Sequence, residues 1–171
     1  MADLGVRLMC SASIALAGLA LAGCDTGKAE DEGPRSKPPA GSSFSCTPTR
    51  VLDGDGPIDC TEGPIVRLAG IAARELDGSC WQGQPCPTVG AEASRDHLAQ
   101  LLSGKSSRVE ALRSGHVAVK GPQLSCISDG PAGSSRTAAW CVSPAVGDLS
   151  CAMVKDGFAL RWEIYWKQHR C

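Results

Sequence analysis

The chain has 171 residues, enough for one domain and additional segments, and its formal net charge is -1 at pH 7. From residue 45 onward acidic and basic side chains are equal in number, so the chain lacks the overall positive charge of many nucleic-acid-binding proteins. This balance excludes long-range attraction to a polyanion, although a few locally placed arginines could still bind phosphate.

The N-terminus predicts an export signal. An apolar stretch over residues 9–22 follows Arg7 and leads into Leu21-Ala22-Gly23-Cys24. A short apolar run that ends in small residues is typical of a cleaved signal peptide and not of a membrane-spanning helix. The sequence at 21–24 resembles the lipobox of bacterial lipoproteins, so we expect residues 1–23 to be removed and Cys24 to be lipidated. The alternative is an ordinary secretory signal that is cleaved nearby.

Residues 25–43 predict a disordered tether, because proline, glycine and mixed charges leave little that could be buried. The globular domain is therefore expected over residues 44–171, a length that can bury a hydrophobic core. With the lipobox, the protein would be a monomer that faces the periplasm and touches the membrane only through its lipid anchor. With the secretory signal, it would be soluble in the periplasm or secreted.

The domain predicts short strands first and helices later. Two strands are expected over 44–52 and 57–60 around the turn Asp53-Gly54-Asp55-Gly56, because Asp-Gly pairs tolerate positive φ. A third strand is expected over 65–71, with Arg67 on the face opposite Val66 and Leu68. In chain order there follow an irregular loop over 75–88, a helix from about 90 that ends at Gly104, a hairpin of strands 108–112 and 116–120, a strand over 137–142, a helix over 148–159 and a third short helix within 160–171.

Eight cysteines remain after the signal segment and Cys24 are set aside, and an even number in an exported domain predicts disulfides. The sequence allows many pairings, but local geometry favours one set. Turns or short loops would bring together Cys46 with Cys60, Cys80 with Cys86, and Cys126 with Cys141, which leaves Cys151 with Cys171. The alternative, a zinc site, is disfavoured because no Cys-x-x-Cys pair is present and the three histidines are scattered.

Several separated motifs together resemble the thermonuclease (staphylococcal-nuclease-like) family. These motifs are Val51-Leu52-Asp53-Gly54-Asp55, the segment from Ile65 to Glu75, Gly90-Ala91-Glu92-Ala93-Ser94, Arg136 ahead of an apolar run, and Met153-Val154-Lys155-Asp156-Gly157-Phe158-Ala159. The resemblance covers about residues 50–165 and depends on the order and spacing of the motifs. It implies an α+β protein with an OB-fold, in which five strands form an open β-barrel accompanied by two to three helices.

The resemblance implies a phosphodiesterase that hydrolyses single-stranded DNA or RNA. Arg67 and Arg136 stand where the family places two phosphate-binding arginines, and a guanidinium group matches phosphate oxygens and stays charged at any working pH. Glu75 stands where the family places the carboxylate that orients or deprotonates the attacking water. These three residues are the candidate catalytic residues.

Tyr165 falls near a position at which the family places a tyrosine that stacks on a nucleotide. The alternative is that Tyr165 covers the hydrophobic core together with its neighbours Trp162 and Trp166. Of these three aromatic residues, Trp162 is the strongest candidate for burial.

The metal-binding part of the pattern is incomplete. The resemblance implies a calcium ion bound by Asp55, with Asp53 beside it, and by two residues that are here Ala72 and Ala73. Calcium takes about six to eight oxygen ligands, and alanine offers no side-chain oxygen. We therefore expect a weak nuclease that binds calcium or another divalent ion weakly. The alternatives are that Arg74 supplies charge in place of the metal, or that the domain is a catalytically degenerate module that binds nucleic acid or protein.

Overall fold

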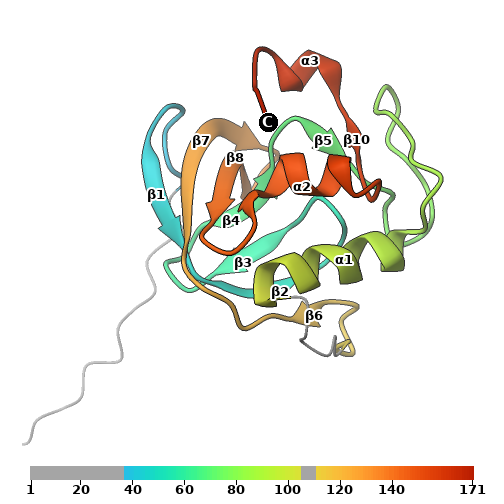
Figure 1. Cartoon of the computed structure of the whole chain (residues 1–171), viewed down its shortest axis with the longest axis horizontal. Helices are drawn as coiled ribbons and strands as arrows, with labels where there is room; N and C mark the ends of the chain where they lie inside the picture. Colours follow the sequence, from blue (N-terminus) through green and yellow to red (C-terminus); the bar gives the residue numbers. More distant parts are fainter. Residues whose placement is uncertain (1–36, 105–110) are drawn as a thin grey trace, which may run out of the picture. The chain divides into compact units, whose positions relative to one another are not determined.

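The structure is a computed structural model that describes residues 37–104 and 111–171 (Figure 1). The predictions for the signal peptide, for Cys24 and for most of the tether therefore lie outside the described residues. Most of the predicted strand 108–112 lies outside them as well. Every candidate residue of the nuclease-like site lies inside them.

The described residues form a mostly antiparallel sheet. Its strands are β1 (Ser43–Cys46), β2 (Pro48–Val51), β3 (Ile58–Cys60), β4 (Ile65–Leu68), β6 (Val117–Ala118), β7 (Leu124–Ala132), β8 (Arg136–Ser143) and β9 (Gly147–Asp148). The order across the sheet is β1-β7-β8-β4-β3-β2-β6, and β9 pairs with β8. Within this sheet, only β4 and β8 pair in parallel. A separate antiparallel pair joins β5 (Ile71–Ala72) to β10 (Leu160–Arg161).

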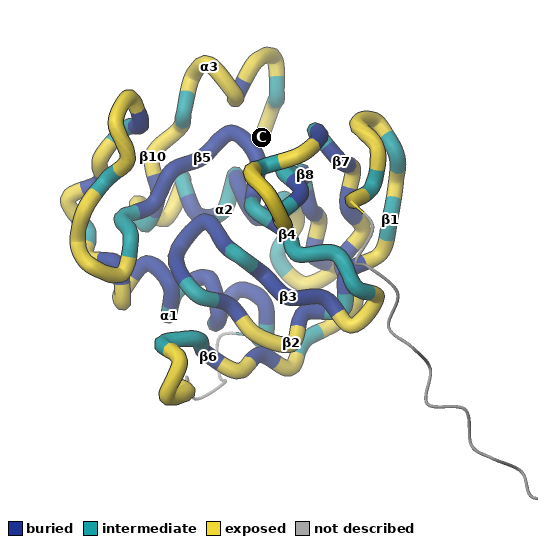
Figure 2. The backbone as a smooth tube through the Cα atoms, turned by 180° about the vertical axis from the view of Figure 1, so that it is seen from behind, coloured by how far each residue is buried: buried dark blue, intermediate teal, exposed yellow. Residues whose placement is uncertain are grey.

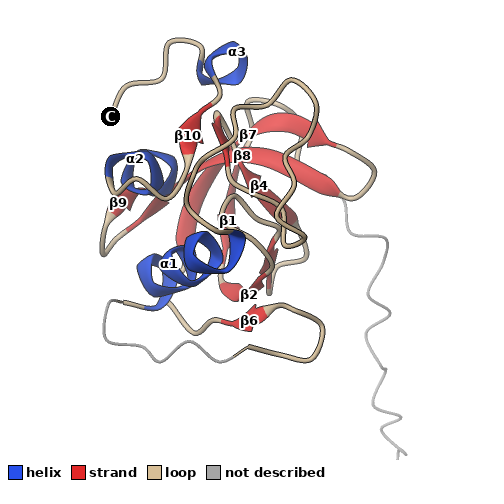
Figure 3. Cartoon of the chain, turned by 90° about the vertical axis from the view of Figure 1, so that its right-hand side faces the viewer, coloured by secondary structure: helices blue, strands red, loops and turns tan. Residues whose placement is uncertain are grey.

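Three helices complete the described part of the chain: α1 (Ala91–Ser103), α2 (Leu149–Lys155) and α3 (Glu163–Trp166). Figure 3 shows α1 and α2 on the same side of the sheet. The predicted α+β class is therefore confirmed. The sheet has eight strands where five were expected. It is not closed into a barrel, because β1 and β6 at its two ends do not pair with each other.

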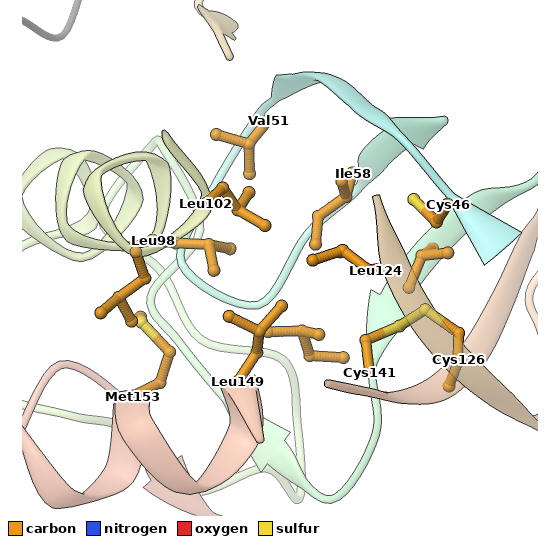
Figure 4. Packing of buried hydrophobic residues seen from close by; sticks show 14 of the residues in the cluster. Cys46, Val51, Ile58, Leu98, Leu102, Leu124, Cys126, Cys141, Leu149 and Met153 are labelled. Atoms are coloured by element: carbon orange, nitrogen blue, oxygen red, sulfur yellow. A yellow bond between two sulfur atoms is a disulfide. The ribbon is translucent and has the colours of Figure 1, made fainter. Parts of the chain in front are cut away.

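The hydrophobic core lies between the sheet and the two longer helices. Leu98 and Leu102 from α1, and Leu149 and Met153 from α2, are fully buried against strand residues (Figure 4). The strand residues of this core include Val51, Ile58 and Leu124. Burying each such side chain stabilises the fold by about 1.5–3 kcal/mol. Figure 2 shows the consequence, with the inner strands β3 and β5 buried and much of α3 exposed.

The four disulfides join the cysteines as predicted: Cys46–Cys60, Cys80–Cys86, Cys126–Cys141 and Cys151–Cys171. Cys126 and Cys141 are direct partners in the register of β7 and β8. Four disulfides in a chain of this size indicate an oxidising environment. Within the described residues, no helix combines the length and the apolarity needed to cross a membrane.

The segment that precedes β1 makes ordered contacts with β7. The Gly41 backbone N–H donates to the Ser128 carbonyl at 2.8 Å, and the Ser128 N–H donates to the Ser42 carbonyl at 2.9 Å. The Ser128 hydroxyl also donates to the Pro38 carbonyl at 2.8 Å. Residues 38–42, which the composition assigns to the tether, therefore extend the hydrogen bonding along β7.

Candidate functional site

The two candidate phosphate-binding arginines project from neighbouring strands. In the parallel pairing of β4 with β8, Arg67 lies opposite Ala138. Alternate residues of a strand share a face, so Arg136 at the start of β8 lies on the same face as Ala138 and Arg67. Sequence positions that are 69 residues apart are thus brought together by the one parallel pair of the sheet.

Both arginines line one cleft of about 320 Å³, together with Trp162 and Tyr165. The Arg67 guanidinium carbon lies 5.7 Å from the centroid of the Trp162 ring. Trp162 and Tyr165 meet edge to face, with their ring centroids 4.7 Å apart. The Tyr165 side chain is 46% exposed. The cleft therefore combines two cationic groups with accessible aromatic surface.

The structure corrects the expected burial of the tryptophans. Trp166 is the core residue, with only 2% of its surface exposed, whereas Trp162 is half-buried and lines the cleft. Trp162 is positioned by its backbone N–H, which donates to the Gly70 carbonyl at 2.7 Å. Gly70 has a φ of 72°, and a Cβ at this position would lie 2.3 Å from the Trp140 ring. Only glycine fits at position 70 without a shift of the Trp140 ring.

Arg67 is held in place by Asp55. The Asp55 Oδ2 atom accepts a hydrogen bond from Arg67 Nη2 at 2.6 Å, and Oδ1 accepts one from Arg67 Nε at 3.3 Å. Oδ2 also accepts the Ala73 backbone N–H at 3.0 Å. Both oxygens of this nearly buried carboxylate are thus used by the protein itself. Such a bidentate, partly buried pair fixes the orientation of the guanidinium group.

Asp53 lies directly behind this pair. Its Oδ1 atom accepts the Asp55 backbone N–H at 3.2 Å, and only 5% of the residue is exposed. Burial raises the pKa of Asp53 to about 8, with contributions from the negative charges of Asp55 and Glu75. At pH 7 the folded protein therefore holds Asp53 mostly as the neutral acid.

Glu75 is half-buried in the loop that follows β5 and is electrostatically coupled to both arginines. Burial raises the pKa of Glu75, and the negative charge of Asp55 adds to this effect. A hydrogen bond from Trp81 and the positive charges of Arg67 and Arg136 act in the opposite direction. Glu75 therefore belongs to the same charged group as the two arginines, although it does not line the cleft itself.

The residues around Asp55 do not fit a calcium ion. Ala72 and Ala73 are buried and offer no side-chain oxygen, and Asp55 has both oxygens engaged. The Arg74 guanidinium is directed to other groups, because its Nε donates to the Pro87 carbonyl at 3.0 Å and its Nη1 to the Gly78 carbonyl at 2.6 Å. Across the described ranges, no three acidic, histidine or cysteine side chains gather at ligating distance around Asp55. A calcium site needs more free oxygen ligands than this arrangement provides.

The predicted site residues thus fall into two sets. Arg67, Arg136 and Tyr165 line the cleft, whereas Asp55 is hydrogen-bonded to Arg67, and Asp53 and Glu75 interact with Arg67 electrostatically. The sequence did not indicate that Trp162 would line the cleft, because nothing in its local pattern separates it from a core tryptophan. No protein-family profile matches the chain, and no curated protein or solved structure gives a match.

Proposed function

We propose that this chain is a thermonuclease-like protein with an OB-type fold that binds the phosphodiester backbone of single-stranded DNA or RNA in the cleft between Arg67 and Arg136. The observation that carries the proposal is that two guanidinium groups and two aromatic rings share one cleft. Arg136 makes no ion pair with any described residue, so its charge is available to a phosphate.

Each element of the cleft has a separate role in this binding. Arg67 uses two of its N–H donors on Asp55, and its remaining donors can contact a phosphate oxygen. Arg136 supplies the second guanidinium, with its Nε donating to the Ala132 carbonyl at 3.3 Å. Tyr165 and Trp162 offer ring faces to a base, a contact that typically contributes about 1–3 kcal/mol and tolerates any base.

The number of phosphate contacts gives a sharp test. For a single strand, the logarithm of the binding constant falls with the logarithm of salt concentration by about 0.7 per neutralised phosphate. Two arginines predict a slope of about -0.7 to -1.4, measured by fluorescence anisotropy with a labelled oligonucleotide. No binding at low salt, or a slope several times steeper, would show that this cleft is not the binding site.

Slow hydrolysis without calcium is the second candidate function, because Glu75 is coupled to both arginines. In this reaction Glu75 would take a proton from the water whose oxygen bonds to phosphorus, while the guanidinium groups stabilise the charge on the phosphate in the transition state. The bond from phosphorus to the leaving sugar oxygen breaks, and that oxygen takes a proton from solvent. The test compares cleavage of single-stranded DNA and RNA by the wild type and by Glu75→Gln, with EDTA and with Ca²⁺. Cleavage by the wild type that is lost in Glu75→Gln supports this function. If the wild type does not cleave either substrate, the hydrolysis proposal is wrong and only the binding function remains.

The proposed location is the periplasmic face of a bacterial membrane, to which a lipid on Cys24 attaches a monomeric domain. The Leu21-Ala22-Gly23-Cys24 sequence supports the anchor, and the four disulfides support an oxidising compartment. Cys24→Ser should move the protein from the membrane fraction to the soluble fraction. Unchanged fractionation would contradict the anchor.

A further inference from the structure

A second cluster of chemically reactive side chains lies at the N-terminal end of α2, next to the C-terminal segment of the chain (Figure 1). His169 Nε2 lies 3.0 Å from Asp148 Oδ2 and 3.7 Å from Cys151 Sγ. The ligand atoms of Asp148, Cys151 and His169 all lie within 4.8 Å of one another. The Cys151 sulfur is bonded to Cys171, which brings a fourth ligating residue to the same place.

These spacings lie within about 0.4 Å of the edges of a tetrahedral zinc site. With zinc–nitrogen and zinc–oxygen distances of about 2.1 Å and a zinc–sulfur distance of about 2.3 Å, a tetrahedron has edges of about 3.4 Å and about 3.6 Å. The observed nitrogen–oxygen and nitrogen–sulfur separations are 3.0 Å and 3.7 Å. Because Cys151 is oxidised in the disulfide, its sulfur is not a thiolate ligand in the structure described.

We propose that the dithiol form of the Cys151–Cys171 pair binds Zn²⁺, with Asp148, Cys151, His169 and Cys171 as its four ligands. A thiol reductant supplies two electrons and two protons to the disulfide and is itself oxidised to a disulfide. Zinc then displaces the two thiol protons as the two Zn–S bonds form. The same residues therefore hold either a disulfide or a metal ion, so the state of this segment depends on both redox conditions and zinc.

Contacts that are independent of the disulfide position the ligands. Asp148 Oδ1 accepts the Cys151 backbone N–H at 2.8 Å, which leaves Oδ2 facing His169. The His169 ring stacks on Trp140 with centroids 3.7 Å apart, and its carbonyl accepts the Trp166 indole N–H at 2.9 Å. Ligands that are already oriented lose less freedom when a metal binds, so three of the four are prepared for zinc before it arrives.

The sequence contains this site as two short-spaced pairs, Asp148-x-x-Cys151 and His169-x-Cys171. The expectation of no zinc site rested on the absence of a Cys-x-x-Cys pair and on scattered histidines. The return of the chain after α3 places the second pair against the first, a proximity that the spacing of the residues does not indicate.

The proposal is tested with Cys171→Ser, which frees the Cys151 thiol without any reductant. Zn²⁺ affinity is measured by competition with a chromogenic chelator, and Co²⁺ serves as the spectroscopic probe of thiolate ligation and tetrahedral geometry. We expect one Zn²⁺ per chain, held by the three remaining ligands Asp148, Cys151 and His169. Adding His169→Ala should weaken binding at least about tenfold, the least that loss of a supporting residue costs in zinc sites. The control His116→Ala removes a histidine whose ring is hydrogen-bonded to Ser114 and which is no ligand of the proposed site, and it should change nothing.

A chain that keeps both Cys151 and Cys171 gives the second arm. In a Cys80→Ser/Cys86→Ser background, which removes the other surface-accessible disulfide, a mild thiol-free reductant should be needed for zinc binding. The double variant Cys151→Ser/Cys171→Ser, checked for its fold by circular dichroism, should bind no zinc. The proposal is overturned if the reduced chain that keeps Cys151 and Cys171 binds no zinc while folded, or if His169→Ala leaves the affinity unchanged.

Discussion

At the scale of single residues, the site is defined by which charges are already paired. Asp55 fixes Arg67 with two hydrogen bonds, whereas Arg136 has no carboxylate partner in the described residues. A buried, paired guanidinium is a rigid donor, and an unpaired one is free to follow its ligand. In the proposed binding mode, Arg67 would orient the phosphate and Arg136 would supply most of the attraction.

Replacing Arg136 tests this division. Arg136→Ala removes charge-assisted hydrogen bonds worth about 1.5–3 kcal/mol, so the dissociation constant for a single-stranded oligonucleotide should rise about tenfold or more. The dissociation constant of Arg136→Lys should lie between those of the wild type and Arg136→Ala, because lysine keeps the positive charge but lacks the planar guanidinium group. The matched control is Arg113→Ala at an exposed position away from the cleft, and anisotropy titrations compare the three variants. Equal losses for Arg113→Ala and Arg136→Ala would contradict a specific role.

Asp53 makes the stability of the fold depend on pH. Its pKa is about 8 in the folded protein against 3.8 for the unperturbed group, so folding favours the protonated acid. The contribution of Asp53 to stability is therefore greatest below pH 4 and falls as the pH rises toward 8. Asp53→Asn can still accept the Asp55 N–H and carries no charge. We expect it to be more stable than the wild type by more than about 1 kcal/mol at pH 9, and nearly equal at pH 4, in thermal unfolding followed by circular dichroism. A difference that does not vary with pH would contradict the assignment.

At the scale of elements, the sequence predicts several strands but none over β7, the longest strand of the described residues. Asp129-Gly130-Pro131-Ala132-Gly133 is typical of a hairpin turn between Cys126 and Cys141, and β7 nevertheless runs as far as Ala132. The register shifts between Ser128 and Gly130, and Gly130 has a φ of 109°, so a β-bulge absorbs these residues and the chain turns after Ala132 instead. Turn-forming residues cannot show by themselves whether they end a strand or bend it.

The second helix shows a related limit. The apolar pattern predicts a helix over 148–159, but α2 ends at Lys155. Asp156 forms its C-cap, and Gly157 follows with a φ of 81°. Glycine in this left-handed conformation is a common helix stop, and the apolar residues beyond it pack as an irregular segment. The start of the same helix is predicted well, because Asp148 caps it through the Cys151 N–H.

Gly70 lies between β4 and β5, and its carbonyl accepts the backbone N–H of Trp162, which lines the cleft. Gly70→Ala places a Cβ 2.3 Å from the Trp140 ring at a φ of 72°, so it combines backbone strain with overpacking. We expect a loss of about 2–4 kcal/mol in the free energy of unfolding, measured by denaturant titration. Gly63→Ala is the control, since its φ of 105° carries the strain without any neighbour within 4 Å. An equal loss in both variants would show that the contact with Trp140 does not matter.

At the scale of the whole molecule, the sequence predicts the parts of the site better than their arrangement. The motif spacing indicates Arg67, Glu75 and Arg136, and Ala72 and Ala73 mark the missing ligands. It does not indicate that Arg67 and the Ala73 N–H occupy both oxygens of Asp55, because that depends on how the strands meet. Three of the disulfides were predictable because each spans a local turn or a short loop, and Cys151–Cys171 followed as the remaining pair.

The central claim is that the cleft binds a single strand through its arginines and without calcium. The most direct measurement is the dissociation constant of a labelled single-stranded oligonucleotide in EDTA and in millimolar Ca²⁺, at equal ionic strength. Because Asp55 is already occupied by Arg67 and Ala73, we predict that the two constants agree within about twofold and that Arg136→Ala weakens both equally. Binding that calcium strengthens tenfold or more, with loss of that effect in Asp55→Asn, would contradict the account.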